Sequence, residues 1–268
     1  MFVGPCMFAY MMISAVKREV RFIIFLHCIA EVTDNFPNSI IKRYFAYCSI
    51  FKKDKVMRRE EHIRLWMAVG LIQEDERRNK EVEDMGNDIF QILVSSSLFQ
   101  DVKMDEYGYV TGCMHHLSIS LSKHENLCLV DPTSDDDIVR VKHLAMCRFQ
   151  EDDIYLTFRK MNSIVFKEDM TNRTMHTLIF RGTIEKNISL QRFKCLRVLK
   201  FSACALKKIN DSVGELVHLR YLDLSYTKSK VLPKSIGKLY HLIFVEHKPI
   251  RNMGRLTSLR TLLDCRVG

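Results

Sequence analysis

The sequence predicts a multi-domain α+β protein in which a helical unit ending in a β-hairpin precedes a unit built from repeated coils. Three observations predict this fold class. The chain has 268 residues, which is room for about two domains at ~150 residues each. Apolar residues recur at helical spacing in the first half. In the second half, whole blocks of sequence recur at a fixed interval.

The composition is that of a chain that buries a core. Hydrophobic residues make up 47% and charged residues 27%, which excludes wholesale disorder and a collagen-like fibre. The net charge of +9 permits contact with acidic partners, but 32 acidic residues among 41 basic ones are unlike a histone-like surface. The 9 cysteines include no C-x-x-C pair, so neither a disulfide framework nor a zinc ribbon fits. Reduced thiols predict a cytoplasmic protein.

Residues 1–34 form an apolar segment to which the sequence assigns no domain. In this segment the apolar run Met1–Val16 precedes the basic residues, whereas a secretory signal places them first. Neither this run nor Phe22–Ala30 reaches the ~20 apolar residues of a membrane-spanning helix. No membrane contact is therefore expected. The segment is interpreted as a helix that packs against something outside this chain, or as the result of a misplaced start codon.

A winged-helix domain is predicted for residues 35–130. Apolar residues at three- and four-residue spacing place three helices there, and two short strands around a turn follow them. The expected helices lie at 37–48, Arg58–Ala68 and 82–93, and the expected strands at Leu98–Lys103 and Tyr109–Cys113. Gly70 is placed to end the second helix. Three helices followed by a hairpin are the plan of a winged-helix domain.

Nucleic-acid binding is the alternative function for such a domain. Between Lys42 and Arg59, seven of the eight charged residues are basic, and such a cluster can neutralise phosphates. The third helix would have to enter the groove, and it carries four carboxylates that would repel the nucleic-acid backbone. These are Glu81, Glu83, Asp84 and Asp88. A solvated or interdomain basic face is therefore the preferred interpretation, and no nucleic acid is expected as a partner.

Residues 142–268 are predicted to form an α/β leucine-rich-repeat solenoid. Cys195–Phe201 matches His218–Leu224 at a shift of 23 residues, and Leu242 and Val245 continue the series. The form L-x-x-L-x-L, repeated at this interval, is the leucine-rich-repeat pattern. Residues 131–141, which include the acidic run Asp135–Asp137, are expected to be a linker, and the array is expected to be truncated.

The concave face of the repeats is the predicted recognition surface. Alternate residues of each strand point into the repeat core, so the residues between them face the concave surface. The residues predicted to carry protein recognition are Arg181, Lys200, Tyr221, Asp223, Phe244 and Glu246. No catalytic residue is expected. A metal site is not expected either, because the cysteine and histidine residues between Cys113 and Cys128 do not have the spacing of zinc ligands.

Several segments resemble plant intracellular immune receptors of the nucleotide-binding, leucine-rich-repeat class. Arg43–Asp54 resembles the family's R-C-F-A-Y-C-S-I-F-P-K-D segment, and Leu65–Gly70 resembles its L-W-M-A-E-G segment. Met114–Leu117 falls where the family has M-H-D-L, and Val231–Leu239 resembles its repeats. The resemblance implies the winged-helix part of the family's NB-ARC module followed by repeats. The phosphate-binding pattern G-x-x-x-x-G-K-[ST] does not occur in this sequence.

The resemblance also implies a function. It implies a non-enzymatic receptor of plant innate immunity, here truncated, whose repeats bind a pathogen effector or a guarded host protein. In an intact receptor the repeats would also contact the nucleotide-binding domain. The family binds ADP or ATP, and His115 would contact ADP, but without the phosphate loop weak or no binding is expected and no cofactor is assigned.

Two further expectations complete this interpretation. The basic residues 42–59 and the acidic residues Asp135–Asp137 are expected to attract each other and hold the two halves together. The alternatives to a receptor fragment are a winged-helix nucleic-acid-binding protein and a nonfunctional gene fragment that does not fold.

Overall fold

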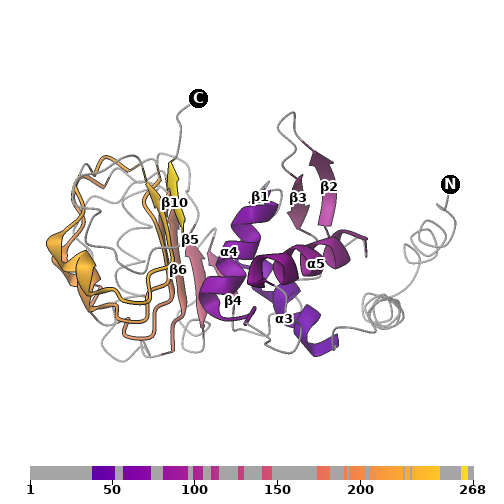
Figure 1. Cartoon of the computed structure of the whole chain (residues 1–268), viewed down its shortest axis with the longest axis horizontal. Helices are drawn as coiled ribbons and strands as arrows, with labels where there is room; N and C mark the ends of the chain where they lie inside the picture. Colours follow the sequence, from indigo (N-terminus) through magenta and orange to yellow (C-terminus); the bar gives the residue numbers. More distant parts are fainter. Residues whose placement is uncertain are drawn as a thin grey trace, which may run out of the picture.

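The structure is a computed structural model in which two units lie side by side, with helix α4 facing a parallel sheet (Figure 1). The described residues are 38–51, 57–73, 81–95, 99–104, 110–114, 126–129, 141–146, 174–181, 190–191, 193–202, 206–225, 227–229, 231–247 and 261–264. The expectation for residues 1–34 lies outside them. In the described part of the chain, no helix is long and apolar enough to cross a membrane.

The three expected helices are confirmed in the first unit. They are α3 (Asn38–Cys48), α4 (Arg59–Val69) and α5 (Val82–Ser95). Helix α4 ends where the sequence predicts, because Gly70 adopts the left-handed conformation with φ of 80° and donates its N–H to the carbonyl of Met67. This conformation strains any residue that has a Cβ atom.

The expected hairpin is present, and it carries an additional strand. Strands β2 (Phe99–Met104) and β3 (Val110–Met114) pair antiparallel, and β1 (Met57–Arg58) pairs with the other edge of β3. The sequence did not predict β1, because two residues are too few to show the alternation by which strands are recognised.

The core of this first unit centres on the single tryptophan of the sequence. Trp66 of α4 is fully buried, and its ring lies edge-on to Tyr44 of α3 with the ring centroids 5.2 Å apart. Gly86 of α5 allows the close approach of α4, because a Cβ atom at this position would meet the side chain of Ile63. The predicted helix faces are therefore packed against one another.

In the described residues, the second unit contains a sheet of seven parallel strands in the order β10-β9-β8-β7-β6-β5-β4. The strands are β4 (Asn126–Leu129), β5 (His143–Met146), β6 (Thr177–Arg181), β7 (Val198–Ser202), β8 (Tyr221–Asp223), β9 (Phe244–His247) and β10 (Thr261–Asp264). Val198, Tyr221 and Phe244 are register partners, which confirms the 23-residue shift. Each lies two residues after one of the leucines Leu196, Leu219 and Leu242, all of which are buried in one core.

The connections between strands carry short 3-10 helices where the expected α/β pattern implies α-helices. They are η3 (Asp211–Glu215) and η4 (Lys234–Lys238), and in Figure 1 they lie on the side of the sheet away from α4. The coils stack closely here, because a Cβ atom at Gly214 would collide with Ser235. The side chain of Asn210 caps η3 by accepting a hydrogen bond from the N–H of Ser212.

The sheet of the second unit begins earlier in the sequence than the predicted domain boundary. Strand β4 lies within residues 35–130, which the sequence assigned to the winged-helix domain, yet it pairs in parallel with β5. Strands β4 and β5 lie on either side of the linker predicted at 131–141 in the sequence, so this segment connects two strands of the same sheet. Its residues lie largely outside the described part of the chain. Strand β4 was missed because it lies outside the repeat spacing and precedes the acidic run that suggested a boundary.

The first prediction concerns the stacking of the coils. Replacing Gly214 by alanine forces a methyl group against Ser235 and its backbone, so we expect a loss of about 1–3 kcal/mol in the free energy of unfolding. Chemical denaturation followed by circular dichroism measures it. Val217→Ala is the control, because Val217 is 47% exposed on the same coil and should change the stability by less than about 0.5 kcal/mol. Equal midpoints for both variants would contradict the close stacking.

Candidate functional site at the interface between the two units

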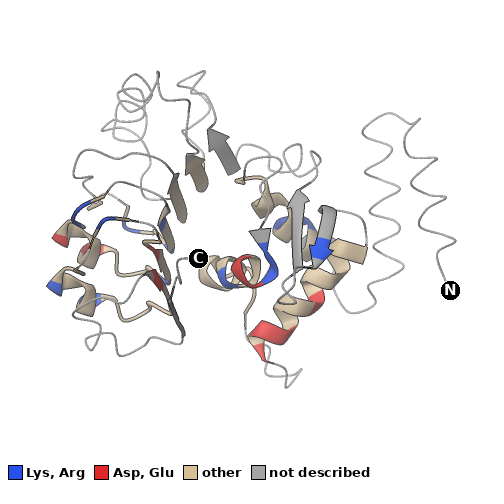
Figure 2. Cartoon of the chain, turned by 90° about the horizontal axis from the view of Figure 1, so that it is seen from above, with Lys and Arg blue, Asp and Glu red and all other residues tan. Residues whose placement is uncertain are grey.

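One side of the second sheet packs against α4, and we refer to it as the helix-facing side. Its residues lie at alternate strand positions, while leucines such as Leu199 and Leu222 point into the core on the other side. Helix α4 contacts both β7 and β8. The two views agree on this placement (Figures 1 and 2).

The apolar part of the interface is continuous with the core of the first unit. Five residues of the second sheet, namely Ala145, Ile179, Val198, Tyr221 and Phe244, belong to the same buried cluster as the residues of α3, α4 and α5. All five are at most 4% exposed. Burial of apolar side chains stabilises by roughly 25 cal/mol per Å², so this ring of contacts favours the docked arrangement.

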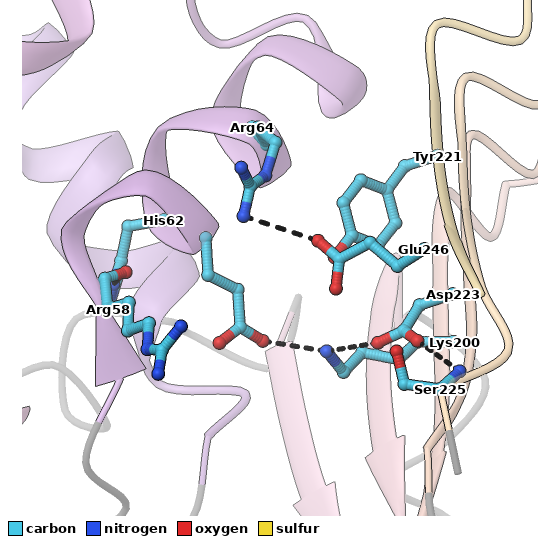
Figure 3. Close-up of polar contacts among 9 residues, drawn as sticks. Arg58, His62, Arg64, Lys200, Tyr221, Asp223, Ser225 and Glu246 are labelled. Carbon is cyan, nitrogen blue, oxygen red and sulfur yellow. Dashed lines mark hydrogen bonds and ion pairs between the residues drawn. The ribbon is translucent and has the colours of Figure 1, made fainter. Parts of the chain in front are cut away.

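A buried cation lies at the centre of this apolar surface. The ammonium Nζ of Lys200 on β7 is 2.8 Å from Oε1 of Glu61 on α4 and 2.5 Å from Oδ2 of Asp223 on β8 (Figure 3). The side chains of Lys200 and Asp223 are 7% and 1% exposed. Asp223 is fixed in turn, because its Oδ1 accepts the backbone N–H of Ser225 at 2.7 Å.

The electrostatics keep this lysine charged. Burial alone would lower the pKa of Lys200, but the neighbouring carboxylates of Glu61, Asp223 and Glu246 raise it above its usual value. An ammonium group in such a site needs its anionic partners, because the desolvation of an ion costs several kcal/mol. Glu61 belongs to the first unit, whereas Asp223 and Glu246 belong to the second, so the ion cluster is complete only when α4 is docked.

A second polar contact joins α4 to β9. Arg64 Nη2 is 3.4 Å from Oε1 of Glu246, and the hydroxyl of Tyr221 donates to the same oxygen at 2.7 Å. Figure 3 shows Arg64 reaching from its helix toward Glu246. Burial and the adjacent Asp223 raise the pKa of Glu246, while Lys200, Arg64 and the hydrogen bond from Tyr221 oppose this effect. Burial likewise raises the pKa of Tyr221, so its hydroxyl keeps its proton.

Two smaller contacts extend the interface beyond α4 itself. The Tyr47 hydroxyl of α3 lies 3.3 Å from Oγ1 of Thr177, which is also 2.9 Å from Nδ1 of His143. Burial, assisted by nearby cations, lowers the pKa of His143 to about 3, so its imidazole is neutral at physiological pH. At the end of α4, Arg197 Nη1 donates to the carbonyl of Val69 at 2.5 Å, where a cation suits the helix dipole.

This arrangement is suited to holding two units together. The charged groups at its centre are paired with one another, which favours one register of the helix on the sheet. Within the described ranges, no group of three or more histidine, cysteine or acidic residues could hold a metal ion.

The structure brings together most of the residues predicted for the repeat surface. Lys200, Tyr221, Asp223, Phe244 and Glu246 all lie on the helix-facing side and are buried. Arg181 lies in β6, but its side chain is outside the described residues. The predicted ADP contact His115, the histidines His116 and His124, and the acidic run at 135–137 are outside them as well.

Sequence reasoning missed Glu61 and Arg64, the residues of α4 that meet the sheet. A signal for them exists: they are three residues apart and so share one face of the helix. Both residues follow the predicted basic cluster in the sequence. They place one negative and one positive charge beside the apolar residues Ile63, Trp66 and Met67 of the same helix. The described contact between the units therefore uses these two residues of α4.

The acidic face of α5 is consistent with the sequence-based argument against nucleic acid. Glu83 and Asp84 in the helix and Glu81 directly before it are exposed, and Asp88 is half-buried. Figure 2 shows acidic residues along this helix, at the lower right. A phosphate backbone would meet negative charge on this helix.

The comparisons with known proteins agree with this architecture. Residues 50–121 match the family described as "Disease resistance protein Winged helix domain", and residues 173–263 match "Leucine-rich repeat region". Disease resistance protein RGA2 of Solanum bulbocastanum is 32% identical over 182 residues, which cover 66% of this chain and 15% of the relative. RPP13 of Arabidopsis thaliana is 31% identical over 189 residues, which cover 68% and 21% respectively. The chain thus spans about a fifth or less of the length of these two relatives.

The second prediction concerns the buried lysine. Replacing Lys200 by methionine leaves Asp223 buried without its cation, so we expect a loss of about 3–5 kcal/mol in the free energy of unfolding. Urea denaturation measures it. Lys194→Met is the matched control, because Lys194 pairs with Glu215 at 3.2 Å while 58% exposed, and such a pair contributes about 0–1 kcal/mol. Similar losses in the two variants would show that the buried cluster has no special role.

The third prediction concerns pH. The folded chain raises the pKa of Glu246 above the ordinary 4.5, so the protonated form favours folding. This contribution is fully present below pH 4.5 and is lost as the pH rises through the raised pKa. Relative to Glu246→Gln, which stays neutral, the wild-type chain should therefore become less stable as the pH increases. Unfolding free energies of both chains from about pH 4 to about pH 8 test this, and a constant or opposite difference would contradict it.

Proposed function

Because the chain belongs to the plant disease resistance proteins that combine a winged-helix domain with leucine-rich repeats, we propose that it works as the restraining part of an immune receptor. In this role the repeats hold the winged-helix unit through α4 until a protein partner displaces it. The observation that carries the proposal is the buried Lys200, whose charge is balanced by one carboxylate from each unit.

The contacts at the interface support such a restraint. A partner that binds the helix-facing side of the sheet has to displace α4, because both occupy the same surface. Displacement separates Glu61 from Lys200 and Arg64 from Glu246, and the exposed surface then carries aromatic residues and both charge signs. That surface is the one predicted for protein recognition. We further propose that the sheet with η3 and η4 forms a curved solenoid, as the repeat pattern implies.

Catalysis is not part of this proposal. The polar groups of the described interface serve each other, and the proposed action is a change of contacts between units. The sequence lacks the phosphate-binding loop, so we do not assign ADP binding to this chain, and the role of His115 stays a prediction. We propose a cytoplasmic location, which is supported by Cys48 and Cys195 being free thiols.

The fourth prediction tests the coupling between the units. Trp66 fluorescence follows the winged-helix unit, and circular dichroism follows both units. We expect the two signals to change at the same urea concentration in the wild-type chain, because the units share one core. In Glu61→Lys, a second cation faces Lys200, so the Trp66 transition should move to lower urea concentration and separate from the other signal.

The matched control is Glu60→Lys, which makes the same charge change on the same helix. Glu60 pairs with Arg59 at 3.0 Å and is 30% exposed, so the two signals should stay coincident. Separate transitions in the wild-type chain, or coincident ones in Glu61→Lys, would refute the proposed restraint. A chain without any cooperative transition would instead favour the nonfunctional fragment.

A further inference from the structure

A groove lies on the connections that lead from β7 to η3 and from β8 to η4. It encloses about 610 Å³, and the described residues that line it are 207–209, 211, 228, 229 and 231–234. Equivalent positions of two stacked coils form its two walls, because Ile209 and Leu232 are 23 residues apart and both are buried. The stacking therefore gives the groove a fixed shape.

The groove has a strong excess of positive charge. Lys207, Lys208, Lys228 and Lys234 line it, and all four are exposed. None of these four lysines forms an ion pair with another residue that the structure describes. This distinguishes them from Lys200, which is buried between two carboxylates. The carboxylate that lines the groove, Asp211, already accepts a hydrogen bond from the Ser235 hydroxyl at 3.4 Å.

The groove also offers apolar contact between its charges. Val231 is 48% exposed, which is high for an aliphatic residue, and the neighbouring Pro233 is half-buried. An aliphatic side chain of a ligand that covers Val231 would gain roughly 25 cal/mol per Å² buried. The ligand that fits this surface is anionic and carries an apolar side chain between its negative charges.

We propose that this groove binds an acidic peptide segment of a partner protein, with an aliphatic side chain over Val231 and carboxylates facing the four lysines. A peptide is favoured over a nucleic acid by the chemistry of the lining. Bases stack on aromatic rings or arginine planes, and none of the described residues that line the groove is aromatic or an arginine. Planar bidentate contacts to phosphate are made by arginine, whereas lysine acts as a point charge.

The groove is separate from the surface that α4 covers. Its lining residues belong to the connections to η3 and η4, and in Figure 1 these two short helices lie on the side of the sheet away from α4. A partner can therefore bind it while the winged-helix unit remains docked. This assignment rests on the proposed function, since it names the kind of protein that the repeats would engage before α4 is released. Excess positive charge also accelerates the encounter with an acidic partner.

The experiment measures binding of fluorescent peptides to the full chain by fluorescence anisotropy at physiological salt. The peptides are short runs of aspartate and glutamate with one leucine, placed at each position in turn. The double variant Lys208→Glu/Lys234→Glu should weaken the best peptide at least about tenfold, which is about 1.4 kcal/mol. Lys194→Glu/Lys238→Glu makes the same change in net charge on exposed lysines outside the groove and should weaken it far less.

The outcomes separate the groove from general electrostatics and from other ligands. Equal weakening by the two double variants would overturn the proposal, because net charge alone would then explain binding. Failure of every acidic peptide to bind would overturn it as well. So would duplex DNA or inorganic phosphate that binds more tightly and with the same sensitivity to the groove variant. Glu61→Lys, which tests the restraint by α4, should leave peptide binding unchanged, so the two proposals can fail independently.

Discussion

The contact between the two units depends on a single ammonium group held between carboxylates from different parts of the chain. Lys200 cannot be buried alone, because the transfer of an ion away from water costs several kcal/mol. Asp223 comes from the neighbouring strand, whereas Glu61 arrives only with α4. The repeat sheet thus contains a charge whose surroundings are complete only when the winged-helix unit is in place. This is a constraint on position more than a source of stability, since a buried ion pair and its desolvation cost nearly cancel.

The apolar ring around this charge explains how the docked arrangement forms at all. Water is excluded on the sheet side by four apolar or aromatic residues, namely Ile179, Val198, Tyr221 and Phe244. Their burial against α4 provides the favourable free energy of docking. The excluded water also strengthens the ion pairs, because electrostatic interactions are stronger where the local dielectric constant is low. Apolar burial therefore supplies affinity, and the charges determine which register of the helix is accepted.

Local pattern predicted much of the fold, but it could not predict the interface. The spacing of Ile63, Trp66 and Met67 predicted α4, because this signal lies within a single helix. The recurrence of Leu196 as Leu219 predicted the register of the sheet, because this signal lies within a single repeat interval. Glu61 and Lys200, which form an ion pair across the interface, are 139 positions apart in the sequence. No periodicity in the sequence connects them. Strand β1 was too short to show alternation, and β4 lies outside the repeat spacing. The alternation of the strands did predict which residues face away from the repeat core, although not that the chain itself covers them.

The end of α4 shows how closely the helix and the repeats are fitted to each other. Gly70 turns the chain in the left-handed conformation, a Cβ atom there would lie 3.0 Å from Arg197 Nη1, and that guanidinium donates to the last carbonyl of the helix. The same β7 coil also carries Lys200. A repeat coil without Arg197 and Lys200, grafted next to this helix, would therefore lose both the hydrogen bond to Val69 and the ion pair with Glu61.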